Sequence, residues 1–123
     1  MEEDLLREDI LNLFMDEFPG IMKTIDTDDE GIYFILGMFG AYLTKGILKN
    51  TIPENTLGRI FKILNLMGQT RRDLEVHNLL AVCIFEKVTD EKQCIAPVRK
   101  RLTGNALILF EKTVSAWGID ENS

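Results

Sequence analysis

One stretch, DLEVHNLLAVCIFEKVT over residues 73–89, constrains the fold of this chain more than any other. Ten of its seventeen residues are apolar. At the helical spacing of about 100° per residue, they leave almost no direction free of an apolar side chain. A helix that is apolar on every side has to be surrounded by other elements. We therefore predict a central helix over residues 73–89, with the rest of the chain packed around it.

Apolar residues at helical spacing predict four more helices along the chain. We expect them at residues 4–18, 28–49, 53–68 and from 103–105 to 118. In the second of these, Asp29 and Glu30 fall in the first turn, where carboxylates favour the helix dipole. Between the central and the last helix we expect a short segment that is capped by Asp90 and holds Cys94, and then a separate turn that starts at Pro97.

No alternation of apolar and polar residues lasts for six positions, so we expect no strands. A chain of 123 residues is long enough for one domain with its own core. Helices of a dozen or more residues with short connections indicate an all-α bundle. We therefore predict a single all-α domain over residues 1–123, with about five to seven helices. Residues 119–123 are expected to form a flexible polar tail.

Small residues form a stripe along the second expected helix: Gly37, Gly40, Ala41 and Thr44 stand at i, i+3, i+4 and i+7. Each glycine weakens a helix interior by about 1 kcal/mol. Two glycines on one stripe therefore predict that another backbone approaches this helix closely. In the third helix, Gly68 is placed to end the helix.

Composition places the chain among ordinary soluble proteins, with 46% hydrophobic and 28% charged residues. No positively charged leader precedes an apolar core, so we expect no signal peptide. The most apolar segment, residues 31–43, has thirteen uncharged residues, fewer than the roughly 20 that a membrane span needs. The two cysteines are expected to be reduced structural thiols. These features predict a cytoplasmic protein without a membrane partner.

The net charge of −6 is distributed unevenly. Residues 1–30 contain eleven acids and two bases, while the remaining residues carry a net charge of +3. Nucleic-acid binding depends on cationic contacts to phosphate, so an acidic chain is a poor candidate for it. The same polarity suits a basic protein partner.

The acids of the first quarter fall on two segments. Four polar residues lie on the face of the first helix opposite its apolar side, and three aspartates lie before the second helix. The candidate partner-binding residues are Glu8, Asp9, Asn12, Asp16, Asp26, Asp28 and Asp29. A face that only keeps the protein soluble remains the alternative.

Metal binding is not expected. Asp26, Asp28 and Glu30 imitate the opening of an EF-hand calcium loop, but the bidentate glutamate of the twelfth position would fall on Gly37. Helix capping explains these acids better. His77 is the only histidine, and no second histidine is present to complete a metal site.

Catalysis and cofactor binding are not expected either, because no nucleophile motif accompanies His77. Asn78 falls between Phe85 and Val82 on the helical wheel, so we expect its amide to be partly buried and hydrogen-bonded to a neighbouring helix end. A role in a functional cleft is the alternative. The basic clusters at 71–72 and 99–101 are short and lack interleaved aromatic residues, which favours solvated faces over nucleic-acid binding.

Three segments together resemble a small all-helical bacterial family of unknown function. They are Leu13-Phe14 followed by Phe18-Pro19, the stretch YFILGMFGAYL at residues 33–43, and EVHNLLAVCIFEKV at residues 75–88. In that family a leading LF…FP, a central helix of small residues and an E-x-x-N-L-L-x-V…E segment recur. Its members resemble the immunity proteins of bacterial toxin systems, including contact-dependent growth inhibition. The motifs are core positions, so the resemblance implies a fold and an immunity role and transfers no functional residue.

These observations lead to two hypotheses. The first is an immunity protein that neutralises a cognate toxin, such as a basic nuclease, by covering its active site or substrate groove. The second is a helical adaptor that binds a protein or peptide partner in a groove. The first predicts an acidic contact surface, and the second predicts an apolar groove with weak salt dependence. The sequence does not define the oligomeric state.

Overall fold

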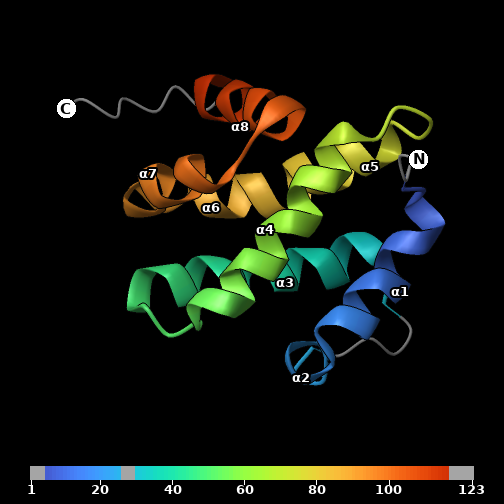
Figure 1. Cartoon of the computed structure of the whole chain (residues 1–123), viewed down its shortest axis with the longest axis horizontal. Coiled ribbons are helices and arrows are strands. Elements are labelled where there is room, and N and C mark those ends of the chain that lie inside the picture. The colour runs from blue at the N-terminus through green and yellow to red at the C-terminus, as the bar shows by residue number, and fades with distance from the viewer. Residues whose placement is uncertain (1–4, 26–29, 117–123) are drawn as a thin grey trace.

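The computed structural model describes residues 5–25 and 30–116, and within them it contains seven helices and no strand (Figure 1). The predicted all-α bundle is confirmed. Residues 117–123, which include the expected helix end at Gly118 and the polar tail, lie outside the described part. The helices are α1 (Arg7–Glu17), α2 (Pro19–Met22), α3 (Ile32–Lys49), α4 (Glu54–Gln69), a central helix, α7 (Lys92–Arg101) and α8 (Gly104–Ala116).

The central helix consists of three consecutive parts, α5 (Glu75–Asn78), η1 (Leu79–Phe85) and α6 (Glu86–Thr89). The middle part, η1, is a π-helix, in which each N–H bonds to the carbonyl five residues earlier. The Glu86 N–H, for example, donates to the Ala81 oxygen. The predicted continuous helix is confirmed. Its wide π-helical turns were not predicted from the sequence.

This helix forms the centre of the core. It packs against α3, α4 and α8, and Figure 1 shows α4 crossing in front of α3. The prediction that other elements surround it on every side is wrong, because Leu74 is 65% exposed and Val82 is 44% exposed. Its fully buried apolar side chains are Val76, Leu79, Leu80, Ile84, Phe85 and Val88.

Asn78 is exposed, so the prediction of a partly buried amide is wrong. The π-helix explains the error. A residue in a π-helix turns by a smaller angle than in an α-helix, so positions on either side of η1 do not keep their α-helical phase. Phe85 therefore points into the core, while Asn78 and Val82 share the exposed side.

The small stripe of α3 brings two backbones together at one point. A Cβ atom built on Gly40 would lie 2.1 Å from the Cys83 carbonyl oxygen, so only glycine fits there. The Thr44 hydroxyl donates to the Gly40 carbonyl at 2.8 Å. The predicted close approach is confirmed at Gly40. At Gly37 it is wrong, since the nearest atom to a Cβ there is the Lys87 Cε, at 3.9 Å.

Three helix boundaries differ from the predictions. First, α3 begins at Ile32, so Glu30 precedes its first turn. Second, α7 is one helix that continues through Pro97, because proline removes only one backbone hydrogen bond while the buried residues on either side hold the helix in place. Third, Gly68 does not end α4. It lies inside the helix, where a Cβ would meet the Ala106 backbone at 2.6 Å.

Both described ends of α1 are tied to the bundle, which fixes the face it shows to solvent. Near its start, the Arg7 N–H donates to Asp73 Oδ2 at 2.8 Å. Near its end, the Arg59 guanidinium binds the Glu17 carbonyl and lies 5.2 Å from the centre of the Phe18 ring. Between these ties, the buried Phe14 ring meets the Phe39 ring of α3 edge to face at 4.8 Å.

Within the described residues, α3 is the one helix long and apolar enough to cross a membrane, with 18 residues and a mean hydropathy of 1.2. The core helix of a soluble protein passes the same test, and 39% of the residues of α3 are buried inside the bundle. Cys83 and Cys94 are buried free thiols, as the sequence predicted.

Candidate partner-binding surface

The four candidate residues of α1 are all exposed and lie on the side of the helix that points away from the core. We call them the acidic face: Glu8, Asp9, Asn12 and Asp16. In the described part of the chain, none of its three carboxylates forms an ion pair. The adjacent Glu17, in contrast, lies 3.4 Å from the Arg59 guanidinium. The other predicted residues, Asp26, Asp28 and Asp29, lie outside the described residues.

One edge of the acidic face meets the start of α3. Arg7 and Glu8 line a cavity of about 490 Å³ there with Leu11, Ile32 and Asp73. Arg7 thus places one positive charge at the edge of the acidic face. The acidic face therefore borders this cavity, which separates it from the start of α3.

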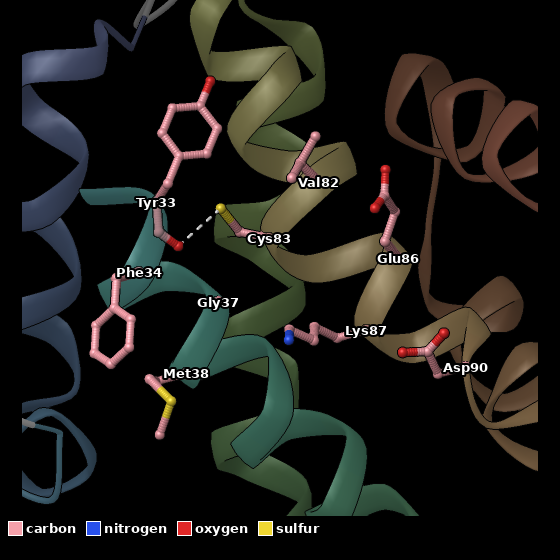
Figure 2. Close-up of a pocket in the computed structure, with 9 residues that line it drawn as sticks. All are labelled: Tyr33, Phe34, Gly37, Met38, Val82, Cys83, Glu86, Lys87 and Asp90. Atoms are coloured by element: carbon pink, nitrogen blue, oxygen red, sulfur yellow. Dashed lines mark hydrogen bonds between the residues drawn. The ribbon is translucent and has the colours of Figure 1, made fainter. Parts of the chain in front are cut away.

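A second surface feature, which the sequence reasoning missed, lies between α3 and the central helix (Figure 2). We call it the apolar groove and define it by four side chains. Tyr33, Phe34 and Met38 come from α3, Val82 comes from η1, and each is between 37% and 47% exposed. The groove has a volume of about 430 Å³. Gly37 leaves it open, because it contributes no side chain between the two flanks.

Charged side chains surround the apolar groove. Glu86, Lys87 and Asp90 line it, and the Tyr33 hydroxyl donates to Glu75 Oε2 at 2.9 Å. Burial, and then this hydrogen bond, raise the pKa of the Tyr33 hydroxyl. The hydroxyl is therefore neutral at physiological pH and acts here as a donor.

Cys83 also lines the groove, but its thiol is buried. The side chain is 2% exposed, and its Sγ lies 3.4 Å from the Tyr33 carbonyl oxygen. Burial raises the pKa of the Cys83 thiol to about 11. Since the thiolate is the nucleophilic form, this cysteine is not suited to covalent catalysis.

His77 is partly buried and lines a separate cavity of about 640 Å³ with Thr70, Arg71 and Asn105, among others. Its Nε2 atom is buried and has no hydrogen-bond partner within the described residues. Among the described residues that line this cavity there is no carboxylate to orient the ring, as a general base would need. Residues 5–25 and 30–116 also contain no group of three His, Cys, Asp or Glu side chains that could hold a metal ion.

Two bases of the 99–101 cluster hold helices together. Arg99 binds Glu111 of α8 through two hydrogen bonds of 2.6 and 2.7 Å, and Arg101 binds Glu54 of α4 through two of 2.7 Å. The hydrogen bonds of the second pair raise the pKa of Arg101 and lower that of Glu54. Both guanidinium groups thus pair with carboxylates through two hydrogen bonds each. A phosphate would need the same pairs of N–H donors.

Asn65 completes the junction of α7 and α8. Its amide donates to the Arg101 carbonyl at 3.2 Å and accepts from the Thr103 N–H at 2.9 Å. No sequence motif marks this role, because the three residues come together only in the folded chain.

No protein-family model, no curated protein and no solved structure matches this chain. The fold and the surface define the class on their own. It is an all-α helical bundle with an acidic helix face and an apolar groove.

Proposed function

We propose that this protein is an immunity protein, which binds a cognate toxin domain and occludes its active site or substrate groove. The observation that carries the proposal is the acidic face. Three carboxylates stand exposed on one helix, and none forms an ion pair within the described residues. Clustered like charges repel one another, so an oppositely charged partner stabilises such a face.

In the proposed mechanism, one set of side chains determines the association rate and another set determines the affinity. Carboxylates on α1 attract a basic toxin and occupy the positions where a nuclease would bind phosphates. Apolar side chains that become desolvated in the complex supply most of the affinity. The resemblance to immunity proteins and the all-α fold are consistent with this role.

The first test looks for a basic toxin domain encoded in a gene beside this one and co-expresses the two proteins. We expect growth to be restored and the two proteins to co-purify. The Asp9→Asn and Asp16→Asn variants, alone and together, should then lower the association rate and weaken its dependence on salt. Glu91→Gln is the matched control, since it removes one exposed carboxylate far along the chain at α7.

Two results would contradict the proposal. One is a complete lack of growth rescue and of co-purification with the neighbouring toxin domain. The other is a complex whose association rate changes equally in the Asp16→Asn and Glu91→Gln proteins, because net charge alone would then explain the effect.

A helical adaptor is the second candidate function, and the apolar groove is the observation in its favour. An adaptor would bind a peptide mainly through apolar contacts, so its affinity would change little with salt. The salt dependence of the complex therefore distinguishes the two functions.

A further inference from the structure

Exposed apolar side chains are concentrated at one place on this protein. In the described residues, eight large apolar side chains are exposed, and four of them form the apolar groove. The others are dispersed over α1, α3, α8 and the residue before α5. Single exposed apolar residues need no explanation, but a contiguous group beside a cavity indicates a binding surface.

The groove is on the side of the bundle that α4 leaves uncovered. In Figure 1, α4 crosses in front of α3, whereas in Figure 2 the same ribbon passes behind α3 and the central helix. On the Figure 2 side, Phe34 and Met38 project from α3, and Val82 projects from the central helix. Figure 2 shows Phe34 and Met38 on the edge of α3 away from the central helix and Val82 on the central helix, so an occupant that contacts all three lies across α3.

The charges around the groove specify the chemistry of the occupant. Glu86 and Asp90 line it, and Glu75 lies beside it as the acceptor for Tyr33. Among the described residues, Lys87 is the one cation that lines it, and its ammonium points towards Gly37 between the two flanks (Figure 2). Arg7 also acts on Tyr33 and offsets Glu75, so the lining itself carries two carboxylates against one ammonium, a balance that favours a segment with apolar anchors and basic flanks.

A second copy of this chain fits the groove less well. A two-fold dimer places the same patch on both sides of the interface, so Glu86 and Asp90 of one copy would approach the carboxylates of the other. Like charges brought together at an interface oppose association. The net charge of −6 adds to the repulsion.

We infer that the apolar groove is the docking site for an amphipathic helix of a basic protein partner. Two apolar side chains of that helix, about one turn apart, contact Phe34, Met38 and Val82, and its lysines or arginines pair with Glu86 and Asp90. The inference rests on the proposed function, because that function requires a basic protein partner. It adds where the partner makes its apolar contact, which is the groove, and which element of the partner makes it, which is an amphipathic helix.

The test uses a synthetic helical peptide of about 18 residues, long enough to form a helix in water. The peptide has leucines one turn apart and flanking lysines, and a second peptide replaces every lysine with glutamate. Binding to the whole protein is measured by fluorescence anisotropy at low salt. We expect saturable binding of the lysine peptide and at least about tenfold weaker binding of the glutamate peptide.

Two matched variants locate the contact. Met38→Lys places a charge at a groove position that is 44% exposed, and Ile108→Lys makes the same change on α8 at a position that is 53% exposed. Both sites are exposed, so both variants should fold, which circular dichroism checks. We expect Met38→Lys to weaken binding about tenfold or more and Ile108→Lys to leave it nearly unchanged.

Three results would overturn the inference. These are the absence of saturable binding, equal effects of the two variants, and a concentration-dependent dimer that Met38→Lys dissociates. The last would assign the groove to a second copy of this chain.

The proposed function can fail separately. A peptide that binds the groove while the neighbouring toxin is not neutralised would refute the immunity role alone. A toxin complex that resists Met38→Lys but weakens with Asp16→Asn would refute the groove alone.

Discussion

Substituting the glycines of α3 with alanine tests how closely this helix approaches the central helix. A Cβ on Gly40 would lie 2.1 Å from the Cys83 carbonyl oxygen, and ordinary contact begins at 3.4 Å. The two backbones would therefore have to separate by about 1.3 Å, the difference between these distances. One turn earlier, a Cβ on Gly37 would find its nearest neighbour at 3.9 Å and need no adjustment.

The magnitudes follow from two opposing effects. Alanine in place of glycine stabilises a helix interior by about 1 kcal/mol. Overpacking a core costs about 1–3 kcal/mol, and the cost at Gly40 should be near the upper end because the obstacle is backbone. We expect Gly40→Ala to destabilise the protein by about 2 kcal/mol and Gly37→Ala to stabilise it by up to about 1 kcal/mol.

Urea unfolding followed by far-ultraviolet circular dichroism measures both variants. For a chain of this size, 2 kcal/mol corresponds to a fall of roughly 8 °C in Tm. Gly46→Ala provides an intermediate case, because its Cβ would meet the Cγ1 and Cδ1 atoms of the Ile52 side chain and not backbone. If Gly40→Ala proves as stable as Gly37→Ala, the inferred close contact between α3 and η1 is wrong.

Three further predictions concern stability. The folded pKa of the Cys83 thiol is about 11 against an ordinary 9.0. The folded state therefore holds the thiol proton more tightly than the unfolded state. This contribution to the free energy of unfolding is fully present below pH 9, and the free energy of unfolding should fall by about 2 kcal/mol as the pH rises to 11. Chemical denaturation at a series of pH values should show this slope, and Cys83→Ala should remove it. Arg59→Ala should cost about 1–2 kcal/mol in urea unfolding, because α1 loses its hydrogen bond and the cation–π contact with Phe18. Asn65→Ala should cost about 2 kcal/mol by the same measurement, since it breaks two hydrogen bonds.

Each of these has a result that would count against it. An unchanged alkaline slope in Cys83→Ala would assign the loss of stability to other groups. If Arg59→Ala were as stable as the wild type, the hydrogen bond to the Glu17 carbonyl and the contact with the Phe18 ring would contribute nothing to stability. If Asn65→Asp were as stable as the wild type, the amide donor to the Arg101 carbonyl would contribute nothing.

Much of the fold could be predicted from local patterns. The spacing of apolar residues located α1, α3, α4, the central helix and α8, because an amphipathic helix shows its buried side in the sequence. The glycine at position 40 was also informative, since a costly residue inside a helix implies a packing reason. Pro97 misled the prediction because tertiary packing around Cys94 and Val98 outweighs one lost hydrogen bond.

The surface was predicted less completely. The exposure of Glu8, Asp9, Asn12 and Asp16 follows from the phase of a single helix and could be read from the sequence. The apolar groove could not, because it depends on how two helices distant in sequence lie beside each other. Its side chains looked like core residues on each helix taken alone, and the π-helix shifted the phase that would have shown Val82 to be exposed.

The wide turns of η1 allow one continuous helix to pack against two different sets of helices. Its first part contacts α1 and α4, and its last part contacts α7 and α8. If the wide turns persist, removing a single residue from η1 would rotate everything after it by somewhat less than the ~100° of an α-helical residue. Phe85, whose ring meets Phe110 of α8 at 5.1 Å, would then turn away from its partner. The length of this segment is therefore under a stricter constraint than the choice of aliphatic residues within it.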